Sequence, residues 1–219
     1  TRLEPYTKDM GMDLTRRTLL GLIKYPGFIR IKSDVKAPEQ QTNQLKSAEW
    51  KPIKGQFLDD RAHYLWLMEG LSLPDQKRFN KRESQESKRL ASECQSVSDR
   101  SIYKSFDASI MEIADDIAYG VHDLEDAIVL NRVSRIAWEE MVLPVLTSID
   151  NPWSNKHAHQ LTDMLFSQEH YERKNAIGAL VNHLITSIEI RLVDNDFEQT
   201  ILKYNVCLND SAEPILTVL

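Results

Sequence analysis

Apolar and polar residues alternate at helical spacing in several stretches of this chain, and the longest of them covers residues 105–131. The apolar positions in it recur every three or four residues, which predicts one helix with a single buried stripe. The stripe consists of Ile110, Ile113, Ile117, Val121, Leu124 and Ile128. At the start we expect a capping box of Ser109 and Glu112, with Asp107 as the competing N-cap, and at the end we expect Asn131 to stop the helix.

Shorter helices are predicted on both sides of this stretch. Thr15 can cap a helix that Pro26 stops, and Pro144 should perturb another. The other predicted helices cover residues 15–24, 58–71, 135–148, 155–167 and 170–193. No alternation is long enough to predict a sheet, so we expect an all-α fold.

Two segments do not carry a clear helical pattern. Residues 27–57 contain Pro38, Pro52 and a polar QQTNQ run, which predicts a long loop. Residues 75–100 are dominated by charged residues, serine and glutamine, and we expect either an exposed charged helix or a mobile segment there.

The polar side of the long helix is unusual in its charge. No lysine or arginine occurs between Lys104 and Arg132, although like charges at i, i+4 spacing destabilise a helix. The polar face comprises Glu112, Asp115, Tyr119, His122, Asp123 and Asp126. One reading is a solvated acidic face, but exposed faces usually mix signs and this one includes a tyrosine and a histidine. The alternative is a site for a cation or for a phosphate-bound metal.

Composition narrows the class of protein. The chain has 219 residues, enough for one sizeable core or for part of a larger one, and its net charge of −6 argues against general nucleic-acid binding. Cys94 and Cys207 lie far apart and outside metal-ligand spacing, which is typical of reduced cysteines. No apolar run approaches the roughly 18 residues needed to span a bilayer, and no signal peptide opens the chain. We therefore expect a cytoplasmic protein with no membrane partner.

Three motifs in this chain match one known family. Residues 110–128, IMEIADDIAYGVHDLEDAI, resemble the last motif of the dGTPase-type deoxynucleoside triphosphate triphosphohydrolases, a branch of the HD-domain metal-dependent phosphohydrolases. Residues 11–26, GMDLTRRTLLGLIKYP, and residues 51–57, KPIKGQF, resemble two further segments of that family. The resemblance implies that residues 1–219 are part of one helical HD-type domain, a partial HD-domain-like bundle.

The resemblance also implies roles for residues of the long helix. Asp115 resembles the aspartate that closes the family's metal site, and the divalent ion expected there is Mg²⁺ or Mn²⁺. Tyr119 resembles the residue that packs on the deoxyribose, and Asp123 resembles the acceptor for the sugar 3'-hydroxyl. The spacing of four and four suits these roles, because it places the three side chains on one helix face. Asp116 is ambiguous between a supporting carboxylate and an ordinary surface acid.

Three residues outside the long helix resemble substrate contacts. Lys24 matches a phosphate contact, Tyr25 its neighbour in the substrate pocket, and Lys54 a lysine that reaches the triphosphate. Each also has an ordinary structural reading. Lys24 would neutralise a helix dipole, Tyr25 would be a core tyrosine, and Lys54 would be a solvated lysine.

The metal-binding histidines of the HD superfamily are not found in their expected place. His122-Asp123 is the only His-Asp pair in the sequence, whereas in the family pattern the metal-binding pair lies upstream of the segment where this chain begins. We therefore expect an internal section of a longer enzyme, with no catalytic residues of its own and no activity alone. In the intact enzyme, metal-activated water would attack the α-phosphate and release deoxynucleoside and inorganic triphosphate.

The resemblance implies a deoxynucleoside triphosphate as substrate and a homo-oligomer as the assembly, and nothing in the sequence indicates nucleic acid as a regulator. Two other functions stay open. One is an HD-type phosphohydrolase that acts on a different phosphate ester, because the superfamily motif does not determine the substrate. The other is a non-catalytic helical scaffold whose acidic face docks a basic partner helix.

Overall fold

A computed structural model describes residues 12–28, 54–81 and 101–219 of the chain. The chain divides into two compact units, one of Thr1–Ser109 with Leu192–Asn205 and one of Ile110–Arg191 with Val206–Leu219. Most of the predicted loop and most of the predicted charged segment, residues 29–53 and 82–100, lie outside the described residues.

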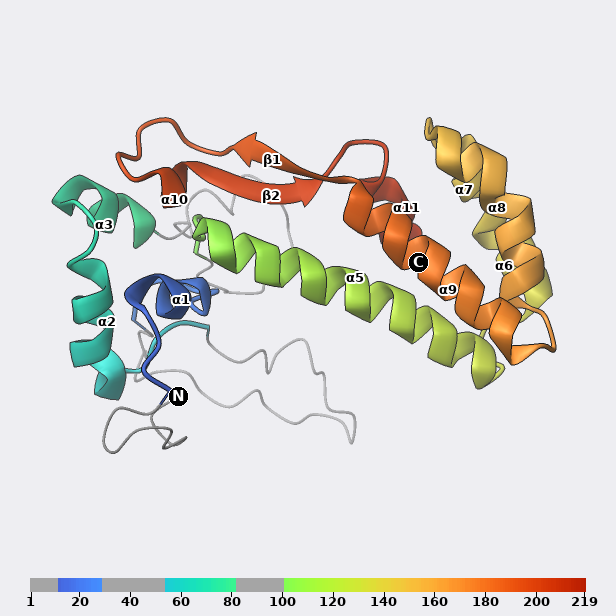
Figure 1. The fold of residues 1–219 in the computed structure, drawn as a ribbon, viewed down its shortest axis with the longest axis horizontal. Helices are drawn as coiled ribbons and strands as arrows, with labels where there is room; N and C mark the ends of the chain where they lie inside the picture. The colour runs from blue at the N-terminus through green and yellow to red at the C-terminus, as the bar shows by residue number, and fades with distance from the viewer. Residues whose placement is uncertain (1–11, 29–53, 82–100) are drawn as a thin grey trace, which may run out of the picture. The chain divides into compact units, whose positions relative to one another are not determined.

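The first unit is built from short helices around a small core. They are α1 (Arg16–Gly21), the 3-10 helix η2 (Leu58–Asp60), α2 (Arg61–Met68), α3 (Leu73–Phe79) and α10 (Thr200–Lys203). As predicted, Thr15 caps α1, and its hydroxyl accepts the Thr18 N–H at 3.2 Å. The helix ends at Gly21, a little earlier than expected. Its inner face packs against α2 (Figure 1). The buried core of the unit consists of Leu20, Ile23, Tyr64, Leu67, Met68, Leu71, Phe79, Phe197 and Leu202.

The predicted charged segment begins inside a packed helix. Ser72 caps α3, and both Asp75 and Phe79 of this helix are buried. The Asp75 carboxylate accepts the N–H groups of Glu198 and Gln199 at 2.9 and 2.8 Å. Because a buried carboxylate is stable only when it is hydrogen-bonded, Asp75 ties α3 to the start of α10.

The long predicted helix is α5 (Phe106–Val129), which has 24 residues. The predicted capping box is wrong, because the helix starts three residues before Ser109. Ser105 caps it instead, with its Oγ accepting the Ala108 N–H at 3.3 Å, while the Ser109 hydroxyl donates to the Phe106 carbonyl at 2.7 Å. Asp107, the competing candidate, pairs with Arg17.

The predicted end of α5 is confirmed. Asn131 adopts a left-handed conformation with φ 54°. Its N–H donates to the Ile128 carbonyl at 3.0 Å, and the Arg132 N–H donates to the Ala127 carbonyl at 2.7 Å. These two bonds make a Schellman motif, which satisfies the last carbonyls of a helix.

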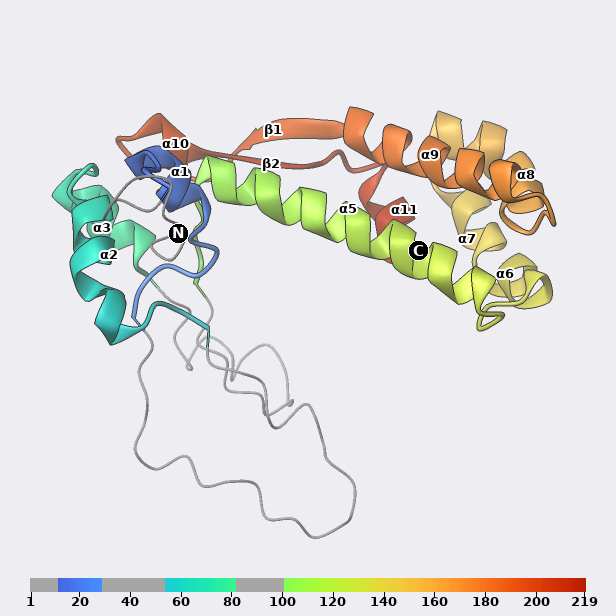
Figure 2. The same ribbon diagram turned by 60° about the horizontal axis from the view of Figure 1, so that its bottom comes forward.

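The second unit packs four helices and the chain's last helix around the apolar stripe of α5. They are α6 (Arg135–Met141), α7 (Leu143–Ser148), α8 (Pro152–Leu165), α9 (His170–Thr186) and α11 (Glu213–Val218). Figure 2 shows α8 and α9 side by side. The predicted perturbation of the helix at residues 135–148 is confirmed, because the helix is interrupted at Val142 and Pro144 lies in the first turn of α7. The core consists of Ile117, Val121, Leu124, Ile128, Trp138, Leu146, Ala158, Leu161, Leu165, Ala176, Ile177, Leu180, Leu184, Leu208, Ala212 and Ile215.

A small sheet corrects the expectation of a purely helical chain. β1 (Ile188–Leu192) pairs with β2 (Tyr204–Leu208), so the predicted helix of residues 170–193 ends at Thr186. Its last residues, Ile-Glu-Ile-Arg-Leu, alternate with the period of a strand, but Ile188 and Leu192 also fit helical spacing. The mainly helical class is otherwise confirmed. Among the described residues, no helix is both long and apolar enough to cross a bilayer.

Candidate functional site

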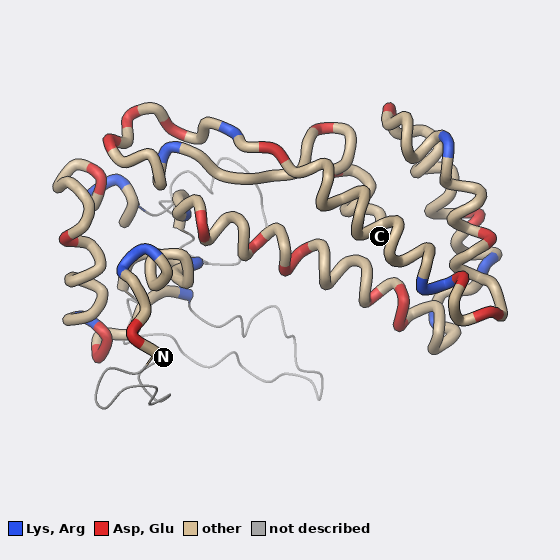
Figure 3. The backbone as a smooth tube through the Cα atoms, viewed as in Figure 1, with Lys and Arg blue, Asp and Glu red and all other residues tan. Residues whose placement is uncertain are grey.

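The acidic face of α5 is exposed, and the stripe behind it is buried. Asp115 and Asp123 are exposed, and Tyr119 is 65% exposed. On the other side of the helix Ile117 and Val121 are at most 3% exposed. Figure 3 shows the acidic residues spaced along α5 without an intervening lysine or arginine. The three predicted residues therefore share one accessible helix face.

The buried stripe does not extend to the first predicted position. Ile110 is 44% exposed, so this part of the prediction is wrong. The buried positions in the first turns of α5 are Ala108 and Ser109, which are at most 3% exposed. Small side chains allow neighbouring backbone to lie close to the start of α5. A search of the sequence for large apolar residues does not detect such positions.

The described residues do not by themselves form a site for a divalent ion. Within residues 12–28, 54–81 and 101–219, no three histidine, cysteine or carboxylate side chains are grouped so that they could hold a metal. The His122 ring is 68% exposed, and its Nδ1 lies 3.8 Å from the Glu125 carboxylate. A catalytic divalent ion needs several ligands, so Asp115 fits such a site as one carboxylate of a larger set. Its role as a metal ligand stays a prediction.

Two of the three predicted substrate contacts outside α5, Tyr25 and Lys54, meet in the first unit. The Lys54 Nζ donates to the Tyr25 hydroxyl at 2.9 Å, across 29 residues of sequence, and it also lies 4.8 Å from the centre of the Tyr25 ring. The two segments are joined by their backbones, with the Gln56 N–H donating to the Gly27 carbonyl at 2.9 Å. The motifs at residues 11–26 and 51–57 therefore meet in space.

Lys24 and Tyr25 lie in the turn that follows α1. The last turn of α1 contains no lysine or arginine, so Lys24 stands beyond the position where it would neutralise the dipole most directly. Tyr25 is only half-buried and its hydroxyl meets Lys54, unlike a core tyrosine. Gly27 has φ 86°, a conformation that favours glycine and that lets the chain reverse here.

The sequence did not reveal how Tyr64 supports this turn. Its hydroxyl accepts the Gly27 N–H at 2.8 Å and donates to the Asn80 side chain. Its ring meets Phe28 edge-on, with 5.0 Å between ring centres. In the sequence Tyr64 is only one apolar position of an amphipathic helix, and no spacing connects it to residue 27.

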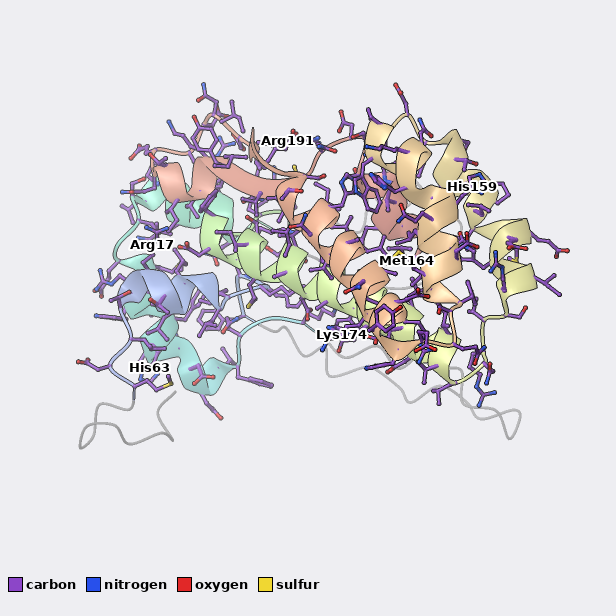
Figure 4. The ribbon with its side chains drawn as sticks, turned by 45° about the vertical axis from the view of Figure 1, so that its right-hand side comes forward. Arg17, His63, His159, Met164, Lys174 and Arg191 are labelled. Atoms are coloured by element: carbon purple, nitrogen blue, oxygen red, sulfur yellow. The ribbon has the colours of Figure 1, made fainter. Side chains whose placement is uncertain are left out.

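A histidine pair in the second unit is separate from these residues. The His183 ring stacks on Trp153, with 4.1 Å between ring centres and 5° between planes. Burial, and then the charge of nearby His157, lower the pKa of His183. His159 lies on the exposed side of α8 (Figure 4), whereas His157 is half-buried beside Trp153. His157 and His159 therefore lie on different faces of α8.

Comparison with known proteins finds several similar proteins that share one name. No protein-family model matches the chain. The chain is similar to proteins called deoxyguanosinetriphosphate triphosphohydrolase-like from Vibrio vulnificus strain YJ016 (45% identical), Vibrio parahaemolyticus (46%) and Pasteurella multocida (44%). Each match includes the whole chain and covers 48%, 49% and 48% of the respective relative. The chain therefore spans about half the length of the curated relatives it matches.

Proposed function

We propose that the intact protein hydrolyses a deoxynucleoside triphosphate to deoxynucleoside and inorganic triphosphate. The proposal starts from the similarity of this chain, over its whole length, to the deoxyguanosinetriphosphate triphosphohydrolase-like proteins. The relation confirms the family resemblance of the three motifs, and it supports the broader class of nucleotide triphosphohydrolase. The 219-residue section is expected to be inactive alone.

The observation that carries this proposal is the exposed face of α5, where Asp115, Tyr119 and Asp123 stand at intervals of four residues. Tyr119 would pack on the deoxyribose and Asp123 would accept the hydrogen bond of the 3'-hydroxyl. Asp115 would give one carboxylate to a divalent ion, Mg²⁺ or Mn²⁺, whose chemistry is to activate water and neutralise phosphate charge. A tyrosine packed against the sugar would disfavour a 2'-hydroxyl by shape.

Lys24, Tyr25 and Lys54 would contact the phosphates of the substrate. In the free protein the Lys54 ammonium donates to the Tyr25 hydroxyl, which leaves the hydroxyl proton of Tyr25 available to donate to an anionic oxygen. Lys24 lies next to Tyr25 in the chain. Two ammonium groups and a hydroxyl donor are suited to a triphosphate, because charge-assisted hydrogen bonds are the strongest that side chains make.

Phosphate-product analysis of the intact protein tests this proposal. The protein is given each deoxynucleoside triphosphate with Mg²⁺ or Mn²⁺, beside Asp115→Ala and a control, Asp126→Ala, which removes another exposed acid of α5. We expect inorganic triphosphate from the wild type and the control, and a loss of at least about a hundredfold in Asp115→Ala, since a lost metal ligand removes transition-state stabilisation. Failure of the wild type to release triphosphate from any substrate would contradict the proposal.

The same assay, repeated with a panel of other phosphate esters, separates the alternatives. Release of phosphate from a different ester would favour the other HD-type hydrolase. No hydrolysis of any ester would favour the scaffold, because an exposed acidic face can also dock a basic helix.

We further propose a homo-oligomer in the cytoplasm. Light scattering of the purified protein and fractionation of cells would test these two proposals.

A further inference from the structure

The helix that precedes Lys24 and Tyr25 is held to the start of α5 by a paired ion contact. The Arg17 guanidinium donates from Nε to Asp107 Oδ2 and from Nη2 to Asp107 Oδ1, both at 2.8 Å. The hydrogen bonds and the charge of Asp107 raise the pKa of Arg17. Such a two-point contact defines an orientation as well as a distance. Figure 4 labels Arg17 on α1.

Two further contacts fix the C-terminal end of α1 at the same place. The buried Ser105 hydroxyl donates to the Leu20 carbonyl at 3.3 Å. A Cβ added at Gly21 would lie 2.9 Å from the Asp107 Cβ, closer than such atoms approach in proteins. Glycine is therefore required at residue 21 by the closeness of α1 to α5, and the helix leaves this contact with little freedom.

The segment of Lys24 and Tyr25 follows α1 directly in the chain. Lys24 and Tyr25 come three and four residues after Gly21, and Tyr25 in turn holds Lys54. α1 has only six residues, too few to be stable without tertiary contacts. The position of Lys24 and Tyr25 thus depends on the contacts of α1 with Ser105 and Asp107 at the start of α5.

We propose that Arg17 is a positioning residue, which through Asp107 holds the segment of Lys24 and Tyr25 in the place where it binds the triphosphate of the substrate. This inference rests on the proposed function. Arg17 does not touch the substrate. It sets the affinity for phosphates, and the rate of the chemical step does not depend on it.

The test compares two neighbouring arginines in the intact protein. Arg17→Ala removes the contact with Asp107. Arg16→Ala removes the same charge from the same helix and leaves that contact in place, because Arg16 lies 4.4 Å over the Trp66 ring and 3.8 Å from Glu69. Both variants are measured for KM and kcat with a deoxynucleoside triphosphate and for the Kd of inorganic triphosphate by calorimetry.

We expect Arg17→Ala to raise KM and the triphosphate Kd by about threefold to fivefold, the range of a well-formed exposed ion pair. Its kcat should stay within twofold of the wild type, and Arg16→Ala should stay within twofold on all three constants. Arg17→Lys keeps the charge and loses the two-point geometry, so its KM and triphosphate Kd should lie between those of Arg16→Ala and Arg17→Ala. If Arg17→Ala does not fold, Arg17→Lys is compared with Arg16→Ala in its place. Equal constants for Arg16→Ala and Arg17→Ala would overturn the inference, and so would a fall of kcat with unchanged KM.

Hydrogen exchange of the amides of residues 22–28 gives a readout that needs no substrate. Exchange should be faster in Arg17→Ala than in Arg16→Ala. Unchanged exchange would overturn the inference even in an active enzyme. Faster exchange in a protein that neither binds triphosphate nor hydrolyses a nucleotide would support the anchoring by Arg17 and contradict the proposed function, so the two failures are distinguishable.

Discussion

A buried hydrogen bond between α6 and α8 offers a sharp test of the second unit, whose core includes the apolar stripe of α5. The Trp138 indole Nε1 donates to the Thr162 hydroxyl at 2.9 Å, and that hydroxyl donates to the Ala158 carbonyl at 2.9 Å. The exposed fractions of Trp138 and Thr162 are 1% and 2%. Neither group can exchange its partner for water.

Thr162→Val keeps the shape of the side chain and removes the hydroxyl that accepts the indole N–H. The indole N–H then stays buried without a partner, which costs about 1–3 kcal/mol. The Ala158 carbonyl is affected less, because a helical carbonyl has its own backbone donor. We expect the free energy of unfolding to fall by about 2 kcal/mol, which lowers Tm by about 4–8 °C in a domain of this size.

Thermal unfolding of the intact protein, followed by near-ultraviolet circular dichroism, measures the effect. Thr162→Ser is the matched control, since it keeps the hydroxyl and loses one methyl group, at a cost of about 1 kcal/mol. In the double variant with Trp138→Phe, which removes the donor as well, the Thr162→Val substitution should cost less than it does alone. Equal stability of Thr162→Val and the wild type would refute the reasoning, and so would equal losses in the valine and serine variants.

Two further predictions concern the pH dependence of stability and the contact between Tyr25 and Lys54. Burial lowers the pKa of His183 below its ordinary 6.5, so between the folded and unfolded pKa values the folded state binds fewer protons than the unfolded state. The contribution of His183 to the free energy of unfolding is therefore fully present above about pH 6.5 and is lost as the pH falls through the folded pKa. His183→Phe should flatten this fall in Tm measured between pH 5 and 8, while His159→Phe, at an exposed site, should not, and equal slopes would contradict the reasoning. Tyr25→Phe removes the acceptor of Lys54 and should raise KM about threefold to fivefold at constant kcat, the worth of one hydrogen bond near solvent; an unchanged KM would show that the hydroxyl has no role in binding.

Local signals in the sequence determined where several helices begin, end and break. Thr15 caps α1, Asn131 ends α5, and Pro144 marks the break after α6, because each acts through the backbone within one turn of itself. Periodicity likewise separated the exposed and buried faces of α5. It failed at Ile188 and Leu192, which fit both a helix and a strand.

The candidate site likewise has one part that the sequence predicts and one part that it does not. The accessible face with Asp115, Tyr119 and Asp123 could be predicted from the sequence, because intervals of four residues within one helix have only one geometry. The meeting of Lys54 with Tyr25 could not, because the spacing of residues along the chain does not say which loops pair. The support of Gly27 by Tyr64 was missed for the same reason.

The sequence by itself thus determined most of the helical pattern, the acidic face of α5 and the family that this chain resembles. Tertiary structure decided what holds the segment of Lys24 and Tyr25 in place. The contact of Arg17 with Asp107 joins residues 90 positions apart, and local rules offered Asp107 only a capping role, which Ser105 fills instead. Local interactions set secondary structure within a turn or two, whereas long-range pairs form only when the packing of the whole unit brings their elements together.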